Sequence, residues 1–252
     1  MKCIDVHCYY GGFGFPTSAP SLAEILATMR ERGVEKAILM SSKSIQYDFV
    51  EGNAEVAAAI APHANLYGYV YINMHYPELS LAEMARYLNT DKFVGVKYNG
   101  EYSRSAACSE ENRHVFDLLE KHYRKPLLLH SWGLAEHGNA MAYSLPSQAL
   151  ELARQHPELT IIMGHMGGPE WPSAIRASQQ APNLYMDMQS SYADRDKIGA
   201  AVRELGPEKV LFGSGSMGSA LMVQLGAVLD ADISAEARHM VLYENARRLF
   251  RI

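Results

Sequence analysis

Three histidines and one lysine lie at or beside short apolar runs of the sequence: His7, His130, His165 and Lys97. Neutral imidazoles bind divalent metals such as zinc, and histidine also exchanges protons near neutral pH. A lysine that is removed from water can form a carbamate or act as a Schiff-base nucleophile, because desolvation lowers the pKa of its amine. A single histidine is more often structural than functional, but three at equivalent positions favour a functional site.

The elements that must position these residues can be read from the same sequence. Eight short apolar runs recur along the chain, and most are too short for helices: 3–7, 36–41, 66–73, 93–98, 127–130, 160–165, 184–188 and 210–214. Helical segments follow them, and two of these segments, 21–24 and 80–83, carry the Ser-x-x-Glu capping-box pattern of a helix start. The repeated order of strand and helix predicts a single (β/α)8 TIM barrel over residues 1–252, in preference to a doubly wound sheet. Chemistry in such barrels lies at the C-terminal ends of the strands.

Strict alternation in the first predicted strand places Cys3, Asp5, His7 and Tyr9 on one face and the residues between them on the other. We expect the polar face to point into the barrel. A buried carboxylate is costly unless it is paired, so we expect Asp5 to hold backbone amides or a neighbouring side chain rather than to act in catalysis.

The order and spacing of several motifs resemble the amidohydrolase superfamily, in the branch that includes aminocarboxymuconate-semialdehyde decarboxylase. The resemblance spans nearly the whole chain. It rests on these segments: Ile4-Asp5-Val6-His7, Gly95-Val96-Lys97, Leu128-Leu129-His130, Ile161-Ile162-Met163-Gly164-His165-Met166-Gly167-Gly168, Pro182-Asn183-Leu184-Tyr185-Met186-Asp187, Leu211-Phe212-Gly213-Ser214 and Glu244-Asn245-Ala246-Arg247-Arg248-Leu249-Phe250.

The resemblance implies one divalent metal, held in this branch by a His-x-His pair, a histidine after the fifth strand and an aspartate after the eighth. His7 and His130 match two metal ligands, and His165 matches a residue that assists acid-base chemistry. The chain departs from the pattern at two ligand positions, where it has Tyr9 and Gly215. Zinc is the first choice of metal, but the two losses also leave open that none is bound, because a zinc site usually needs three protein ligands.

Other candidate site residues follow from position. Tyr9 is a candidate catalytic residue, and Lys97 is one too, as an anchor for a substrate carboxylate, with a structural ion pair as the alternative. Aromatic side chains at or just beyond predicted strand ends are expected to bind substrate. They are Tyr10, Tyr98, Trp132 and His75.

Three functional hypotheses stay open. The first is a hydrolase, or a decarboxylase or other lyase, with an atypical single-metal site and a small carboxylated substrate. The second is a metal-independent acid-base enzyme of the same fold, acting on a lactone or a similar activated substrate. The third is a barrel that binds a ligand but has lost catalysis, since fold alone does not fix function.

Composition narrows the partners. The 252 residues carry a formal net charge of -5 and no cluster of Lys or Arg, which disfavours nucleic acid and membrane surfaces. The N-terminal segment has no apolar signal region, so the expectation is a cytoplasmic protein. Three cysteines without CxxC spacing are expected to be free thiols. A homo-oligomer is common among such proteins, but no interface can be read from the residues.

Overall fold

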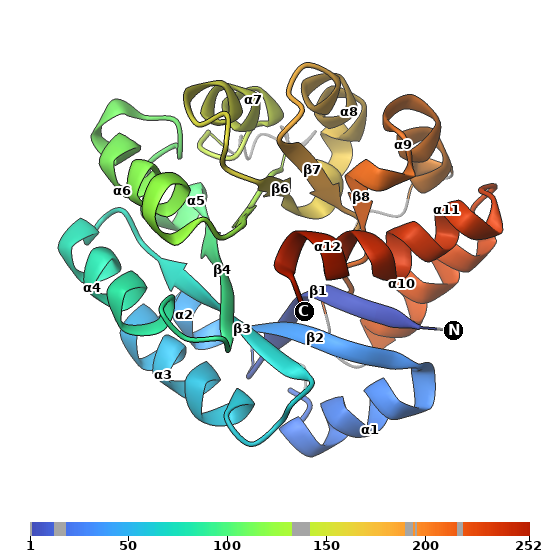
Figure 1. Cartoon of the computed structure of the whole chain (residues 1–252), viewed down its shortest axis with the longest axis horizontal. Coiled ribbons are helices and arrows are strands. Elements are labelled where there is room, and N and C mark those ends of the chain that lie inside the picture. Colours follow the sequence, from blue (N-terminus) through green and yellow to red (C-terminus); the bar gives the residue numbers. More distant parts are fainter. Residues whose placement is uncertain (1, 13–18, 133–141, 190–193, 195, 216–218) are drawn as a thin grey trace.

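Eight parallel strands lie side by side in the order of the chain, β1 to β8. The computed structural model describes residues 2–12, 19–132, 142–189, 194, 196–215 and 219–252. The strands are β1 (Cys3–Tyr10), β2 (Val34–Ser41), β3 (Leu66–Ile72), β4 (Phe93–Tyr98), β5 (Leu127–Leu129), β6 (Ile161–Met163), β7 (Leu184–Asp187) and β8 (Val210–Leu211). Figure 1 shows them around a common centre, with the helices outside them.

Hydrogen bonds join the last strand to the first. The backbone N–H of Val6 donates to the carbonyl of Phe212 at 3.0 Å, and the N–H of Gly215 donates to the carbonyl of His7 at 2.7 Å. Asp5 adds a side-chain link, because its Oδ1 accepts from the N–H of Ser214 at 3.0 Å. The predicted (β/α)8 barrel is therefore confirmed, and Asp5 holds backbone amides as expected.

The helices lie in the connections between strands and, after β8, at the C-terminal end of the chain (Figure 1). They are α1 (Leu22–Arg32), α2 (Ser42–Gln46), α3 (Phe49–Ile60), α4 (Pro77–Tyr87), α5 (Gly100–Ser103), α6 (Arg113–Leu118), α7 (Pro146–Gln155), α8 (Trp171–Gln179), α9 (Lys197–Leu205), α10 (Ser219–Asp230), α11 (Ala235–His239) and α12 (Asn245–Phe250). Short 3-10 or π segments are η1 (Glu110–Asn112), η2 (Leu119–Tyr123), η3 (Gly164–Met166), η4 (Gly168–Glu170), η5 (Pro207–Lys209) and η6 (Met240–Glu244).

One of the two predicted helix starts is confirmed and the other is wrong. Ser21 caps α1, and Glu24 returns a hydrogen bond to the Ser21 backbone, which completes the capping box. Helix α4 instead begins at Pro77, whose fixed φ suits the first turn, so Ser80 lies inside the helix. The Ser80 hydroxyl accepts from the N–H of Asn73 and donates to its carbonyl, and it thereby fastens the end of β3 to α4.

The apolar core has two layers. One fills the barrel and includes Ile4, Ile38, Leu128 and Ile162, with Phe250 of α12 packed against Tyr69 at a ring distance of 5.9 Å. The larger layer lies between the strands and the surrounding helices. Strands that are covered on both faces need apolar residues without polar alternation, and this requirement explains the continuous runs in the sequence.

The predicted faces of β1 need a correction. Ile4 and Val6 belong to the layer inside the barrel, whereas Cys3 and Cys8 pack in the outer layer. The pairing of β1 with β2 shifts register between Asp5 and Cys8, as at a β-bulge. A bulge exchanges the faces beyond it. The residues before it therefore reverse the predicted alternation, whereas after it Tyr9 packs against the inner layer and Cys8 in the outer layer, as predicted.

Two further expectations can be compared with the structure. All three cysteines are free thiols, as predicted. Among the described residues, no helix combines the length and the apolar character that a bilayer crossing requires.

Candidate active site

Three imidazoles meet where β1, β5 and β6 end. The ring centroid of His165 lies 5.0 Å from that of His7 and 4.9 Å from that of His130. His7 lies within β1, His130 follows β5 and His165 follows β6, so the contact depends on the closure of the barrel. The structure thus brings together the three histidines that the sequence singled out.

A hydrogen-bonded chain runs through His7. Its Nδ1 lies 2.9 Å from Oδ2 of Asp187, and its Nε2 lies 3.0 Å from the hydroxyl of Tyr9. A carboxylate only accepts hydrogen bonds, so the Nδ1 of a neutral His7 carries the proton and its Nε2 accepts from Tyr9. The order is therefore carboxylate, imidazole, phenol.

The position of His165 depends on a turn rather than on a strand. His165 lies in η3 with a φ of 63°, in the left-handed region. Such a conformation costs free energy in a residue other than glycine, and conformations of this kind cluster at functional sites. The turn places the ring of His165 at 5.5 Å from that of Trp132, and a Cβ on the neighbouring Gly168 would collide with the same indole.

Burial keeps the three imidazoles neutral. Desolvation, followed by the charge of Lys97, lowers the pKa of His7 well below its usual value. Desolvation, followed by the proximity of the other imidazoles and of Lys97, lowers the pKa of His130 and of His165 in the same way. At pH 7 these rings can therefore accept a proton or pass one on, but they carry no charge.

Two charged groups share this environment. Burial lowers the pKa of the Lys97 amine to about 8, and burial raises the pKa of the Asp187 carboxyl to about 6. At pH 7 both groups are mainly ionised. The centre then holds one cation and one anion among three neutral imidazoles.

Several buried polar atoms of this region have no hydrogen-bond partner within the described part of the chain. They are Lys97 Nζ, His165 Nδ1, the hydroxyl of Tyr71 and Gln189 Oε1. Tyr71 and Lys97 are register partners on β3 and β4. Buried polar groups are nearly always paired, so such a concentration indicates a place where a polar ligand completes the bonding.

The remaining predicted residues lie in different places. Trp132 contacts His165 at the centre. Tyr98 is buried in the outer layer, where its hydroxyl donates to the carbonyl of Ser105, and Tyr10 packs against the same layer. His75 is exposed and lines a separate cavity. Neither Tyr98 nor Tyr10 is thus brought to the histidines.

Sequence reasoning missed Asp187 and Gln189. Asp187 ends β7, so a search of every strand end for polar residues would have found it. Its Oδ1 accepts from the N–H of Gln189 at 2.8 Å, which fixes the carboxylate toward His7. Gln189 carries no signal in the sequence, because it lies beyond the strand and its role depends on tertiary contacts.

The donor set does not fit the three-ligand metal site that the resemblance predicts. Only His7 and His130 remain from that set, and the free nitrogen of His7 already accepts from Tyr9. Burial first, and then Asp187 and Tyr102, raise the pKa of Tyr9, so the phenolate that a metal would need is disfavoured. The Lys97 ammonium adds a repelling charge. Binding of a metal by His7 and His130 is thus a prediction of the resemblance that these donors do not favour.

Gly215 stands where the resemblance predicts an aspartate ligand, and its surroundings also differ from a metal site. Gly215 has a φ of 72°, and a Cβ built on it would collide with the amide of Gln189. The Gln189 side chain thus fills the space where an aspartate of the family pattern would begin. A carboxylate cannot be added there unless Gln189 moves.

A compact group of possible metal ligands lies elsewhere. In the described part of the chain, Asp117, Glu120 and His156 place one ligand atom each within 4.8 Å of the others. These residues belong to α6, η2 and the end of α7, and Oε1 of Glu120 accepts from the N–H of Glu158, before β6 begins. The group therefore lies toward the start of β6, away from the three histidines.

Comparison with known proteins places the chain in a family. The profile of the amidohydrolase family matches residues 5–252, so the protein belongs to that family. No curated protein sequence matches the chain. The fold and the family agree with the resemblance that the motifs indicated.

Solved structures share the whole fold at low sequence identity. A 2,6-dihydroxybenzoate decarboxylase from Rhizobium has a TM-score of 0.81 and 17% identity, covering 99% of this chain and 98% of that one. A dihydroxybenzoic acid decarboxylase from Polaromonas, with bound manganese and the inhibitor 2-nitroresorcinol, has a TM-score of 0.79 and 18% identity, covering 99% and 97%. A 5-carboxyvanillate decarboxylase from Novosphingobium aromaticivorans, complexed with manganese and 4-hydroxy-3-methoxy-5-nitrobenzoic acid, has a TM-score of 0.75 and 16% identity, covering 100% and 96%.

Proposed function

We propose that this amidohydrolase-family protein is an enzyme that decarboxylates a small carboxylated substrate at the C-terminal ends of its strands. The observation that carries the proposal is the contact of His165 with both His7 and His130. The buried Lys97 amine has no hydrogen-bond partner among the described residues. The similar decarboxylases support the reaction class. The formal charge of -5 supports a small molecule over nucleic acid as the partner.

Substrate binding follows from the unpartnered groups. The Lys97 ammonium offers a charge-assisted hydrogen bond to a substrate oxygen, and such bonds are stronger than neutral ones. The Tyr71 hydroxyl and the Gln189 amide oxygen can meet further polar groups of the substrate. Trp132 supplies an apolar wall beside His165.

The reaction needs one proton. The bond between the substrate carbon and its carboxylate breaks, carbon dioxide leaves, and the electron pair stays on the carbon. His165 delivers a ring proton to that carbon while its second nitrogen takes up a proton that comes from water. The neutral state of His165 suits this relay, and the cation of Lys97 offsets the negative charge that develops on the substrate.

A second candidate is hydrolysis of a lactone or a similar activated ester without a metal. The chain of Asp187, His7 and Tyr9 favours it, because an imidazole that is oriented by a carboxylate can act as a general base. Water would add to the carbonyl carbon, the ester C–O bond would break, and the proton of the water would pass to the leaving oxygen. Neither reaction uses the divalent ion, zinc first, that the resemblance predicts on His7 and His130.

The test is carbon dioxide release from a panel of hydroxybenzoates, together with ring opening of a panel of lactones. We expect decarboxylation, and we expect His165→Gln to lower kcat at least about 100-fold. Arg30→Gln, an exposed change on α1, is the control and should leave kcat unchanged. Lactone opening without decarboxylation would replace the first candidate by the second. Ligand binding with neither reaction would support the inactive binding barrel.

A further inference from the structure

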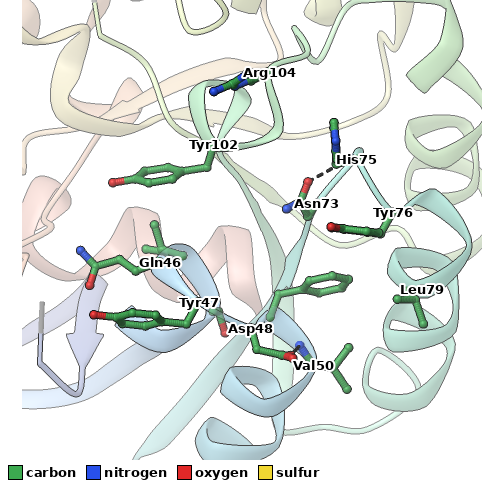
Figure 2. Close-up of a pocket in the computed structure, with 13 residues that line it drawn as sticks. Gln46, Tyr47, Asp48, Val50, Asn73, His75, Tyr76, Leu79, Tyr102 and Arg104 are labelled. Atoms are coloured by element: carbon green, nitrogen blue, oxygen red, sulfur yellow. Dashed lines mark hydrogen bonds between the residues drawn. The ribbon is translucent and has the colours of Figure 1, made fainter. Parts of the chain in front are cut away.

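A separate cavity opens beside the strand ends. Its volume is about 550 Å³, within the range of small-molecule sites. The lining comes from α2 and the start of α3, from the residues after β3, and from α5 after β4 (Figure 2). The proposed reaction, as described above, uses none of these residues.

Exposed aromatic side chains gather here. Tyr47, Tyr76 and Tyr102 are exposed by 75%, 52% and 53%, and all three line the cavity. With Leu79 they make up four of the eight large apolar side chains that are exposed in the described part of the chain. Figure 2 shows the rings of Tyr102 and Tyr47 on the same side of the cavity, with Tyr76 across from them. Concentrated exposure of this kind marks a binding surface.

One cation completes the lining. Arg104 is exposed, has a φ of 48°, and makes no ion pair within the described residues. Asp48 is the only acid among the described lining residues, and it caps α3, because its Oδ1 accepts from the N–H groups of Val50 and Glu51. A guanidinium without a partner, next to aromatic walls, suits an anion such as a carboxylate.

The cavity adjoins the proposed centre through two connections. Lys97 lies on β4, and α5, which follows that strand directly, carries Tyr102 and leads to Arg104. Tyr102 also lies close enough to Tyr9 to contribute, after burial and Asp187, to raising the pKa of the Tyr9 phenol. The cavity therefore lies at the same end of the barrel as the histidines, which is the placement that a second subsite for one substrate requires.

We propose that this cavity is the subsite for the remote part of the substrate, an aromatic ring with an anionic group, held by Tyr47, Tyr76 and Tyr102 and by Arg104. The inference rests on the proposed function for the identity of the reacting end. It adds a substrate class: an aromatic acid that carries a second anionic group besides the carboxylate that is removed.

Calorimetric titration with benzoate and with its neutral counterpart benzamide tests the subsite. Lys97→Met is the background, so that the ammonium at the strand ends cannot bind the probe. We expect Arg104→Gln to weaken benzoate binding at least about tenfold, while benzamide binding changes little. Tyr47→Ala should weaken both probes, and the exposed Arg30→Gln should weaken neither. If Lys97→Met does not fold, the same substitutions are titrated in the protein that retains Lys97.

The outcomes separate this proposal from the proposed reaction. Equal benzoate affinity with and without Arg104→Gln and Tyr47→Ala overturns the subsite, whether or not carbon dioxide is released. Selective loss in these variants supports the subsite even if no decarboxylation is found, because binding needs no turnover. A dimer that dissociates in Tyr47→Ala would show that a second copy covers the cavity, and this would also overturn the proposal.

Discussion

Lys97 is a residue whose burial works against stability. Its side chain is fully buried, and its amine has no hydrogen-bond partner within the described part of the chain. Removing an ammonium from water is costly unless a partner compensates. The cost becomes understandable if the amine is held ready for a substrate anion, since enzymes often retain such groups at the expense of stability.

Lys97→Met should therefore stabilise the protein and abolish activity. Burial lowers the pKa of Lys97 from 10.5 to about 8, so between these values the unfolded chain holds a proton that the native chain has lost. The free energy of unfolding accordingly rises as pH increases from about 8 toward 10.5, and the full cost of the buried charge is present below about 8. At pH 7 we expect a gain of at most about 3 kcal/mol in Lys97→Met.

Urea unfolding at pH 7 and at pH 10 measures this effect. The variant should show a smaller rise between the two pH values than the unchanged protein. Burial also lowers the pKa of Lys197, to about 8, and those of Lys125 and Lys209, and these groups contribute to the pH dependence of both proteins. Lys43→Met, at an exposed ion pair with Glu51, is the control and should change stability by less than about 1 kcal/mol. A destabilised Lys97→Met would mean that the amine has a structural partner.

At the scale of elements, the strands and helices could be predicted from the repeated apolar runs and the helical segments between them. The eight strands and their order follow from apolar runs that burial on both faces requires. The bulge in β1 could not be predicted, because it depends on how β1 pairs with β2, and strict alternation therefore assigned the wrong faces to the residues before the bulge. His165 was found from its type and spacing, but the left-handed turn that aims it is set by packing around η3.

The backbone just after β8 lies very close to β1 and β7 at Gly213. A Cβ added to Gly213 would lie 2.7 Å from Cβ of His7 and 2.9 Å from Oδ1 of Asp187. Both neighbours are buried, so Gly213→Ala must displace His7 or Asp187 and thereby disturb the hydrogen bond that orients the imidazole. We expect a loss of about 1–3 kcal/mol in the free energy of unfolding and a lower kcat.

Gly226→Ala is the matched control. Gly226 lies within α10, and a Cβ there would meet no atom within 4 Å. The same substitution should therefore stabilise the helix by up to about 1 kcal/mol. Urea unfolding compares the two variants. If Gly213→Ala is as stable as the unchanged protein, β1 and β7 can move apart at this point with little cost in free energy.

At the scale of the whole molecule, the polar residues of the candidate site and the compact group of possible metal ligands lie in different parts of the barrel. The histidines and the aromatic cavity lie at the ends of strands, whereas Asp117, Glu120 and His156 belong to the outer helical layer. Lys121 pairs with Asp117 at 2.7 Å, and the buried His156 lies within 3.4 Å of Glu120, so this group already has internal partners. Within the described part of the chain there are therefore two candidate places for a metal.

Thermal unfolding with added zinc or manganese makes that assignment. Because the strand-end donors do not supply three ligands, we expect no rise in melting temperature from that site at micromolar metal. Tyr9→His adds the missing imidazole of the His-x-His pair, and it should raise the melting temperature by roughly 5–10 °C at saturating zinc. His130→Ala in the Tyr9→His background should remove that rise, whereas Glu120→Gln should leave it intact. If the unchanged protein instead binds one equivalent of metal and loses it with His130→Ala, the argument from the donor set is wrong, and His7 and His130 hold a metal with help from another group.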